Sequence, residues 1–596
     1  MVGIAFDCLS NPLGAVRVTF EKAIASGIDP TNLNGKDWGA LDVFRDCLFD
    51  QGALSQVPIL DHSSIGWIQP NSLVRFRGMV QDMLGNEFYV GAFKDGSTWR
   101  TNKFTDIASF PMGSQSETRI WERQLLYCVP VPGQNSWTIQ HSSESMFNRC
   151  NKWTSQHGEK RQRDDEMVID YMVPQESQGS TSSSKKMREG EFTGQSPQLH
   201  ESFNDEMSAK VSVLTSFDSN RLPCLVKVYD SPESDLKLND VLEFVGVFTF
   251  DPVLSVQADG SEDVSNELFE DALSHLPPNK VPRLHCLIHR KLANHDFLLS
   301  SPAIERAPNL VRETREALVG HLTTILGNDG LAAECVLLHL LSRVHGRVDS
   351  VALGKLSLNL TGFTRESLTV FGSQLNHAIQ TLLPFTKSIP FTVEYLNTAS
   401  LAPQKDYEKN RLVTSALQLA EGTHVTIDET QLQEGMLNAT GVENVTLLKN
   451  LMELQKVEYD FNYYKLEMPT DVQLLILSEG KSNILPADLV LPIQPTVVGS
   501  SLNCASEAQQ AWRWYLATLR SSAHDIDPDM QKIIEDDLVA ARQEDRSLGS
   551  NDFSRWLTMG RLVSASFGET RLTLEHWQMV KELERRRKER LNEMRK

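Results

Sequence analysis

The chain has 596 residues, of which 40% are hydrophobic and 23% are charged, and its formal net charge at pH 7 is −20. This length accommodates about four domains or fewer, with ample material for a buried core. Because phosphate contacts need a basic surface, the acidic total argues against a dedicated DNA-binding protein and favours protein partners, although a local basic patch is compatible with it.

The cysteines and the apolar stretches indicate the compartment. Eight cysteines are dispersed without a C-x-x-C pair, as is typical of proteins kept in a reducing compartment. The N-terminus carries Asp7 early and lacks the basic start and long apolar core of a signal peptide. No stretch approaches the ~20 consecutive apolar residues of a membrane span. We therefore expect neither secretion nor membrane insertion.

Five β-strands are predicted after a helical N-terminal region at residues 1–70. Alternating apolar residues and flanking turn residues support them. Their ranges are 73–80, 87–93, 123–129, 224–229 and 241–248. The Gly85-Asn86 turn predicts that the first two strands form a hairpin.

A long polar stretch interrupts these strands. Residues 140–210 are rich in Ser, Gln, Glu and Lys and predict a disordered insertion, because they cannot bury enough apolar surface to offset the entropy lost on ordering. Five strands interrupted in this way predict one barrel of the oligonucleotide-binding (OB) type. Its two parts are residues 71–139 and 211–300.

A barrel of this type binds single-stranded nucleic acid when aromatic side chains lie among cations on its exposed face. Six residues of the first two strands are candidates for such a face: Arg75, Phe76, Arg77, Phe88, Tyr89 and Lys94. The alternative, which the acidic net charge favours, is that half of them alternate into the barrel core.

The second half of the chain has a different pattern. Apolar spacings of three and four predict helices at 311–326 and 331–344, and strands then alternate with helices to about residue 480, as in an α/β layer. Residues 501–596 are rich in Ala, Leu, Glu and Arg and predict a helical bundle. The chain is thus expected to be a multidomain α+β protein.

Asp428 and Glu429 end a short β-branched strand, where a Walker B pair would hold Mg²⁺ and polarise a water molecule. Such a pair needs a phosphate-binding loop, G-x-x-x-x-G-K-[ST], and none precedes it. Residues 361–367 read TGFTRES without a lysine, and Gly480-Lys481-Ser482 follows the pair instead of preceding it. The alternative is that the two carboxylates are only a polar strand end or a helix cap.

Several long motifs resemble the mini-chromosome maintenance (MCM) complex-binding protein family, and the resemblance covers nearly the whole chain outside the insertion. They are LVRFRGMVQDM at 73–83, EFY at 87–89, ERQ at 122–124, YCVPVPG at 127–133, CLVKVY at 224–229, LND at 238–240 and DPVLS at 251–255. The family is similar in layout to the MCM helicase subunits. The resemblance therefore implies an OB-like domain, an AAA+-like core at 301–500 and a helical lid at 501–596.

The departures from the helicase pattern indicate an inactive core. Residues 361–367 lack the phosphate-loop lysine, and LPADL at 485–489 falls where a helicase subunit has its arginine finger. Arg555 lies near the place of a sensor arginine. With Asp428 and Glu429 as a degenerate Walker B pair, we expect no enzyme activity, no catalytic or metal-ligating residue and no cofactor.

The resemblance also implies a function. A member of this family would bind MCM subunits as an inert mimic or chaperone, support assembly of the complex and its unloading from chromatin in late S phase, and support sister chromatid cohesion. It would act in the nucleus, with an indirect chromatin association and no direct contact to nucleic acid or membrane. The alternatives are an atypical AAA+ ATPase that uses Asp428 and Glu429, and a single-stranded DNA-binding protein of the OB type.

Two further groups of residues are candidates for a functional role. Basic residues within the insertion could serve as a nuclear localisation signal or be only solvated charge: Lys160, Arg161, Arg163, Lys185, Lys186 and Arg188. His285, Cys286 and His289 are of the zinc-ligand type, but strand alternation sends Cys286 to the opposite face from the two histidines, so a structural role is expected.

Overall fold

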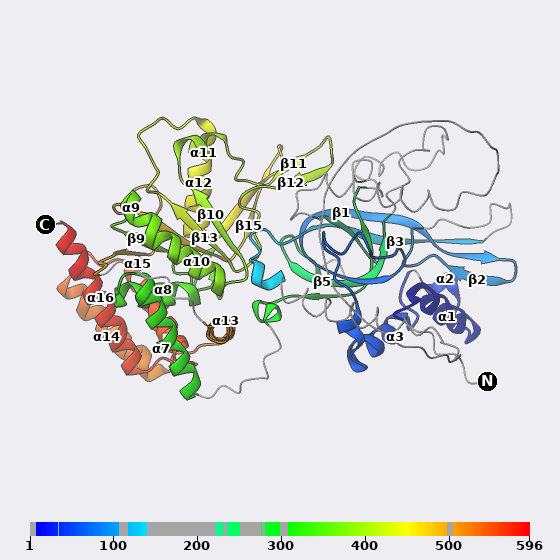
Figure 1. Ribbon diagram of the computed structural model, residues 1–596, viewed down its shortest axis with the longest axis horizontal. Helices are drawn as coiled ribbons and strands as arrows, with labels where there is room; N and C mark the ends of the chain where they lie inside the picture. The colour runs from blue at the N-terminus through cyan, green and yellow to red at the C-terminus, as the bar shows by residue number, and fades with distance from the viewer. Residues whose placement is uncertain are drawn as a thin grey trace, which may run out of the picture.

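The computed structural model describes residues 8–33, 35–106, 117–139, 222–230, 235–250, 276, 280–298, 308–496 and 505–595. One lobe contains the N-terminal helices and a ring of strands, and the other contains a parallel sheet with the C-terminal helices (Figure 1). The mixed α+β class is confirmed. The predicted insertion at 140–210, with its six basic candidate residues, lies outside the described residues.

Five strands of the first lobe close into a ring of order β1-β3-β4-β6-β5, which the pairing of β5 with β1 completes. They are β1 (Leu73–Asp95), β3 (Thr118–Val129), β4 (Cys224–Val228), β5 (Val241–Thr249) and β6 (Arg283–Lys291). β4 and β6 run parallel, and the other neighbours run antiparallel. Phe76, Val226 and Phe244 are among the apolar side chains that fill the inside of the ring.

The predicted hairpin is wrong. Residues 73–95 form one long strand that pairs first with β5 and then with β3. Register shifts between Val80 and Asp82 and between Met83 and Gly85 mark bulges, and Gly85 has a φ of 89°. A bulge uses the same left-handed glycine as a tight turn, so the Gly-Asn pair did not distinguish the two. The chain turns only at Gly96, where β1 leads into the short strand β2 (Thr98–Thr101).

The N-terminal helices pack on the outer face of the ring. They are α1 (Pro12–Ala25), α2 (Pro30–Leu33) and α3 (Ala40–Arg45), followed by a π-helical turn (Asp46–Asp50) and a 3-10 turn (Ala53–Gln56). The ring of Trp38 lies 4.8 Å from that of Phe20 in α1 and 6.1 Å from that of Trp121 in β3, measured between centroids. This apolar contact covers part of the outer surface of the barrel.

The second lobe is built on a parallel sheet of order β10-β13-β16-β9-β17. Its strands are β9 (Leu358–Thr361), β10 (Thr386–Pro390), β13 (Thr423–Asp428), β16 (Val472–Ser478) and β17 (Leu489–Pro492). Its helices are α7 (Pro308–Ile325), α8 (Gly330–Leu341), α9 (Arg365–Ser367), α10 (Ser373–Leu382), α11 (Val393–Thr398) and α12 (Ala439–Leu454). The predicted helices at 311–326 and 331–344 are confirmed as α7 and α8.

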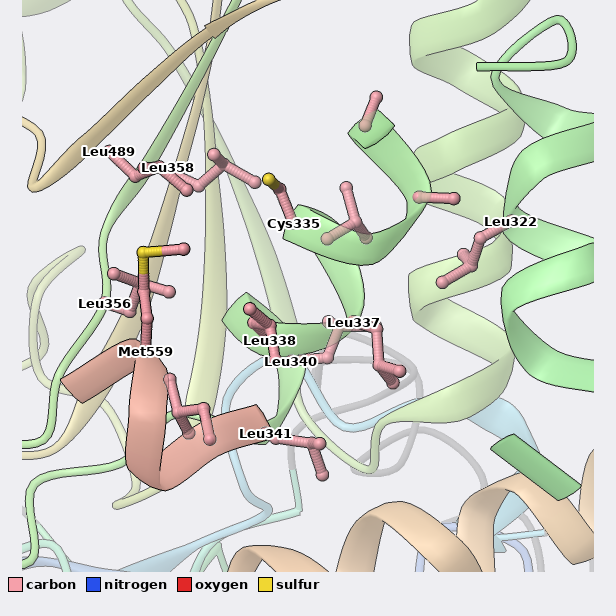
Figure 2. Close-up of a cluster of buried hydrophobic side chains, with 14 of the residues drawn as sticks. Leu322, Cys335, Leu337, Leu338, Leu340, Leu341, Leu356, Leu358, Leu489 and Met559 are labelled. Carbon is pink, nitrogen blue, oxygen red and sulfur yellow. The ribbon is translucent and has the colours of Figure 1, made fainter. Parts of the chain in front are cut away.

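Helix α8 is at the centre of this core. Figure 2 shows α8 between Leu322 of α7 on one side and Leu358 and Leu489 of the sheet on the other, with Cys335 of α8 directed toward the sheet. Nearly every side chain of α8 is buried. A helix that is apolar all round has to be enclosed, so the leucine-rich sequence of α8 dictates its central position.

Two small sheets complete this lobe. The hairpins of β11 (Gln404–Asp406) with β12 (Arg411–Val413) and of β14 (Lys456–Asp460) with β15 (Lys465–Pro469) form a four-stranded sheet, and β7 (Gly346–Val348) pairs with β8 (Val351–Leu353). The four-stranded sheet contacts the barrel. Asp82 of β1 accepts a hydrogen bond from the backbone N–H of Leu412 at 2.7 Å, and Asn239 donates to the Tyr459 hydroxyl at 2.7 Å.

The C-terminal region is helical, as predicted, with α13 (Ser506–Arg520), α14 (Pro528–Glu544), α15 (Ser550–Ser566) and α16 (Leu574–Arg595). Among the described helices, none combines the length and the apolar character needed to cross a bilayer.

Arginines of α15 and α16 bind the backbone of the edge strand β17. They donate to alternate carbonyl oxygens: Arg555 to Asp488, Arg587 to Val490, and Arg590 to Pro492, at 3.2–3.3 Å. An edge strand otherwise presents these groups for pairing with another chain. Arg590 also binds both carboxylate oxygens of the fully buried Asp329, at 2.7 and 2.8 Å. The lid helices are therefore fixed to the sheet by charge-assisted hydrogen bonds.

Replacing Arg590 by Met is expected to destabilise the second lobe by about 3–5 kcal/mol, because it leaves the Asp329 carboxylate buried and uncompensated. Urea unfolding followed by tryptophan fluorescence measures the effect. The matched control is Arg586→Met, which removes an exposed arginine of the same helix. The double variant Asp329→Asn/Arg590→Met should lose less free energy of unfolding than the two single variants lose together. Equal midpoints for the Arg590 and Arg586 variants would contradict this role.

Candidate functional site

The carboxyl-terminal edge of the parallel sheet is where an α/β protein places a ligand, at the point where the chain connections run in opposite directions. Here β9 is followed by β10 at one end of the sheet, whereas its neighbour β16 is followed by β17 on the other side. Asp428 and Glu429 lie at this edge, after the adjacent strand β13. The candidate carboxylates thus lie at the same edge of the sheet as the turn after β9, with β16 between them. That turn is the segment that the sequence pattern marks as a missing phosphate loop.

The backbone of that turn is already hydrogen bonded. The N–H groups of Gly362 and Phe363 donate to the carbonyl oxygens of Glu479 and Ser478, at 2.9 and 3.1 Å. Thr364 N–H donates to the Ser367 hydroxyl at 2.8 Å, and the Phe363 side chain is fully buried. A phosphate-binding loop instead presents successive free N–H groups to its ligand. In this conformation the first three N–H groups of the turn, from Gly362 to Thr364, are therefore taken up by β16 and by Ser367.

The two carboxylates have separate local roles. Asp428 accepts hydrogen bonds from the N–H and the hydroxyl of Thr430, at 3.0 and 2.7 Å, and from the amide of Gln431 at 2.9 Å. It therefore caps the turn that follows β13. Burial raises the pKa of Glu429, and a hydrogen bond with Ser482 opposes this shift. Its Oε2 has no hydrogen-bond partner among the described residues.

Gly480, Lys481 and Ser482 follow β16 and form a bend that Asn359 holds in place. The Asn359 side chain donates to the Ser478 hydroxyl at 2.6 Å and accepts from the Ser482 N–H at 3.1 Å. Lys355, the lysine nearest in sequence before the turn, binds Asp488 at 2.8 Å. In the parts of the chain that the structure describes, no cluster of three or more His, Cys, Asp or Glu is arranged to hold a metal ion.

Arg555, the candidate sensor arginine, forms hydrogen bonds within the lid and with the segment before β17. Its guanidinium donates to Asp552 and Glu584 at 2.9 and 2.8 Å, in addition to the Asp488 carbonyl. Arg555 and Arg587 lower the pKa of the buried Glu584 to about 2, against the effect of burial itself. These contacts give Arg555 a structural role at the junction of β17 with the lid.

The six candidate residues of a nucleic-acid face do not form one surface. Phe76 fills the inside of the ring, and Tyr89 packs under the N-terminal helices. Arg75 and Arg77 flank the buried Glu243, at 3.9 and 2.7 Å. Lys94 approaches Glu117 at 3.6 Å, and Phe88 is 57% exposed. The stacking platform with free cations that single-stranded nucleic acid requires is therefore not assembled by these residues.

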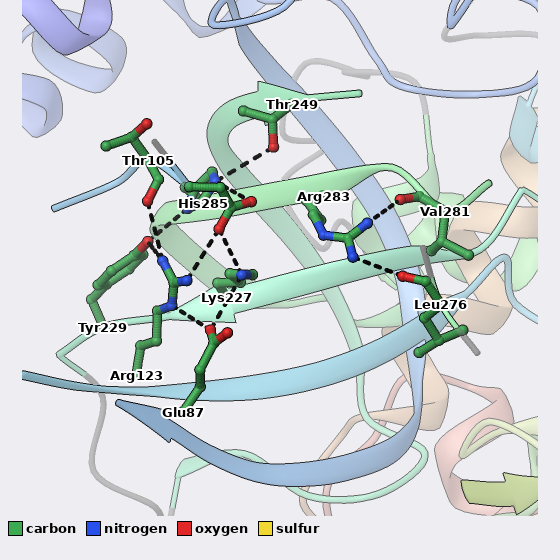
Figure 3. Close-up of polar contacts among 11 residues, drawn as sticks. Glu87, Thr105, Arg123, Lys227, Tyr229, Thr249, Leu276, Val281, Arg283 and His285 are labelled. Carbon is green, nitrogen blue, oxygen red and sulfur yellow. Dashed lines mark hydrogen bonds and ion pairs between the residues drawn. The ribbon is translucent and has the colours of Figure 1, made fainter. Parts of the chain in front are cut away.

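The outer face of the ring instead carries a buried ionic network, shown in Figure 3. Arg123 of β3 binds Glu87 of β1 at 2.6 Å, and Lys227 of β4 binds Asp106 at 2.7 Å. His285 of β6 lies 3.2 Å from Asp106 and bonds to the Tyr229 hydroxyl at 2.6 Å. Burial lowers the pKa of Lys227 and of His285, and Asp106 opposes both shifts.

Sequence reasoning did not find this network, because its members come from separate strands and a loop that only the closed ring brings together. It did separate His285 from Cys286 correctly, but the prediction for His289 was wrong. A register shift after Cys286 pairs His289 with Phe244, whose side chain fills the ring, so strict alternation does not hold as far as His289. His285 joins the outer network, whereas Cys286 packs inside the ring. Since each cation of the network already faces a carboxylate, the network stabilises the barrel and leaves no excess charge for phosphate.

An exposed aromatic group lies at the ends of the two hairpins of the four-stranded sheet. We call Tyr407, Phe461, Tyr463 and Tyr464 the aromatic tip. Tyr463 and Tyr464 are 87% and 59% exposed. The Phe461 and Tyr464 rings stack at 5.0 Å between centroids, and the Tyr407 hydroxyl donates to the Phe461 carbonyl at 2.8 Å. The neighbouring Lys465 is held by Glu443 and Glu458. Such a preorganised aromatic surface suits a protein contact.

Comparison with known proteins identifies the family. The family model described as mini-chromosome maintenance replisome factor matches residues 44–591. The chain belongs to the mini-chromosome maintenance complex-binding protein family.

Relatives of that name align over almost the full length of this chain. The protein from Arabidopsis thaliana is 57% identical over 595 residues, which cover 99% of this chain and 100% of the relative. Those from Salmo salar and Homo sapiens are 34% and 32% identical, and each alignment covers 98% of this chain and at least 97% of the relative. The resemblance drawn from the sequence motifs is thereby confirmed.

Replacing Glu429 by Gln is expected to stabilise the protein at pH 7 by up to about 1 kcal/mol, because it removes the charge of a half-buried carboxylate whose Oε2 is buried without a hydrogen-bond partner among the described residues. The pKa of this carboxyl is raised on folding, so the folded state binds the proton more tightly and stability falls as pH rises between the unfolded and folded pKa values. The gain should be complete above the folded pKa and absent below the unfolded value of about 4.5.

Thermal unfolding of the Glu429 variant at several pH values checks this expectation. Glu434→Gln, at an exposed position of the following loop, is the control. A loss of stability at pH 7 in the Glu429 variant alone would show that the ionised carboxylate is needed and would contradict our interpretation.

Proposed function

We propose that this chain binds subunits of the MCM helicase as a catalytically inactive partner and acts in DNA replication. Its relatives are named for binding the MCM complex. The observation that carries the inactive character is the turn after β9, in which the N–H groups of Gly362 and Phe363 donate to carbonyl oxygens at the end of β16. A turn closed in this way, without a lysine, offers no cradle for a triphosphate.

The proposal includes the kind of domain that each part represents. We assign the closed five-stranded ring to an OB-like domain, interrupted after β3 by the long insertion. We assign the parallel sheet, with Asp428 and Glu429 at its edge, to a degenerate AAA+-like core and α13–α16 to its lid. The proposed domain boundaries are those predicted from the sequence. They are 1–70 for the N-terminal helical region, 71–139 and 211–300 for the two parts of the OB-like domain, 140–210 for the insertion, 301–500 for the AAA+-like core and 501–596 for the lid.

The proposed function depends on the AAA+-like core having the shape of a helicase subunit. An inert core shaped like a helicase subunit docks against a true subunit and occupies a surface that would otherwise close the ring. This mimicry would support assembly of the complex, its unloading from chromatin in late S phase and sister chromatid cohesion. Action in the nucleus follows, with the basic residues between 160 and 188 as a proposed localisation signal.

Complex formation without dependence on ATP is the expected result for an inactive partner. The purified chain is mixed with each MCM subunit and with the assembled ring, and masses are measured by size-exclusion chromatography with light scattering. Complexes of the same mass with ATP, with ADP and without nucleotide would support the proposal. A complex that forms only with hydrolysable ATP, or ATP hydrolysis lost on Asp428→Ala, would instead identify an active ATPase.

The aromatic tip is the proposed contact on the AAA+-like core. The double variant Tyr463→Ser/Tyr464→Ser should weaken binding to the helicase subunit about 30-fold or more, the loss expected when hot-spot side chains are removed. Surface plasmon resonance measures the affinity.

A matched control removes an exposed aromatic residue of the barrel. Phe88→Ser should leave the affinity unchanged. If the tip variant bound as tightly as the unmodified chain, the contact would lie elsewhere, and the N-terminal region or the insertion would be tested next.

A further inference from the structure

The strand β15 is an open edge of the four-stranded sheet. The order of this sheet is β12-β11-β14-β15, and among the described strands β15 pairs with β14 alone. At the opposite edge the barrel covers β12, because Asp82 accepts from the Leu412 N–H and Gln81 donates to the Leu412 carbonyl. All residues of β15 except Met468 are exposed. An edge of this kind is a template for pairing with another strand.

The hydrogen bonds to β14 determine which backbone groups of β15 point outward. At one end of the pair, Phe461 N–H donates to the Tyr464 carbonyl at 3.0 Å, and at the other end Thr470 N–H donates to the residue before β14 at 2.9 Å. Hydrogen-bonded pairs alternate along an antiparallel ladder, so the even-numbered residues of β15 direct their backbone groups to β14. The N–H and C=O groups of Lys465 and Glu467 therefore point to the open side.

The side chains of β15 divide into an apolar and a charged set. Leu466 and Met468 lie opposite buried residues of β14, at the margin of the core beneath this sheet. Leu466 is 46% exposed there. Lys465 and Glu467 project to the other face, because successive side chains of a strand alternate. A strand of this pattern fits a neighbour that has the same alternation.

We propose that β15 pairs with β15 of a second copy of this chain, antiparallel and centred on Leu466. In this register Lys465 lies opposite Glu467 of the second copy, and Glu467 lies opposite Lys465 of the second copy. Both residues direct their backbone groups outward, so each of these two pairs exchanges both of its N–H···O=C bonds. Opposite charges that face each other across antiparallel strands stabilise the pair.

Charge selects this register over its neighbours. A pairing centred on Lys465 or on Glu467 would place like charges opposite each other at the two-fold axis, which is destabilising. A shift by one residue would bring the apolar side chains of one copy to the charged face of the other. Pro469 has no N–H to donate and limits the pairing to the residues before it. The segment 465–467 is thus complementary to itself.

Apolar contacts would provide most of the affinity. Leu466 meets its counterpart across the axis, and Tyr464, which is 59% exposed, lies opposite Met468 of the second copy. Lys465 keeps two carboxylates of its own chain as partners, at 2.6 and 2.7 Å. The ionic contacts between the copies therefore determine orientation more than affinity. A contact of this small size favours a weak dimer, with a dissociation constant in the micromolar range.

Dimerisation requires no helicase partner and would stand if the proposed function failed. If the proposed function also holds, the two partners compete, because Tyr464 belongs both to the aromatic tip and to this strand pair. A helicase subunit that binds the tip would then dissociate the dimer.

Sedimentation equilibrium of the full-length chain over a range of concentrations measures the dimer. Physiological ionic strength screens the repulsion between two acidic chains. The variants Lys465→Glu and Glu467→Lys each place like charges opposite each other in a dimer of their own, whereas an equimolar mixture of the two restores both pairs of opposite charges. Lys532→Glu, at an exposed position of α14, is the matched control. Thermal unfolding checks that each variant is folded.

We expect the unmodified chain and Lys532→Glu to form dimers as concentration rises. Lys465→Glu alone and Glu467→Lys alone should associate about tenfold more weakly or less, because two attractive pairs become repulsive. Their equimolar mixture should recover the affinity of the unmodified chain. A chain that stays monomeric at every concentration, single variants that associate as tightly as the unmodified chain, or a mixture that gains nothing over its components would each overturn the proposal.

Discussion

The Asp329 carboxylate is the contact on which the second lobe depends. It is fully buried and caps α8 through the Ala332 N–H, holds the end of the sheet through the Gln494 N–H, and receives both arms of the Arg590 guanidinium. A buried charge has to be matched by several donors, and here they come from three distant parts of the chain. The apolar helix α8 can therefore be enclosed only when α16 lies along β17. The packing of the core around α8 therefore depends on the position of the lid helix α16.

Hydrogen-bonding groups at two other places on the sheet are likewise occupied by groups of the same chain. At the turn after β9, N–H groups that could bind phosphate are used by the neighbouring strand, and Asp428 caps its own turn. At β17, arginines occupy carbonyl oxygens that could pair with another strand. A core whose edges are satisfied from within keeps its shape without a nucleotide, which is what an inert partner of the MCM subunits would need.

On the outer face of the barrel, side chains of the types that bind nucleic acid form a buried structural network. Arg123, Lys227 and Tyr89 are of the types that nucleic-acid binding requires. Tyr89, however, packs beneath the N-terminal helices, and Arg123 and Lys227 face carboxylates. The partners of each cation, more than the number of cations, distinguish a structural network from a candidate binding site.

The sequence by itself determined the features that depend on neighbouring residues. Helical spacing located α7 and α8, composition located the C-terminal helices, and the missing lysine at 361–367 and the pair Asp428-Glu429 could be read directly. Only the tertiary structure decided that residues 73–95 form one bulged strand, that Gly362 and Phe363 are bonded to β16, and that Glu87, Arg123, Lys227 and His285 meet. These outcomes depend on pairings between residues far apart in the chain, and local propensity carries no information about which distant group will satisfy a given donor.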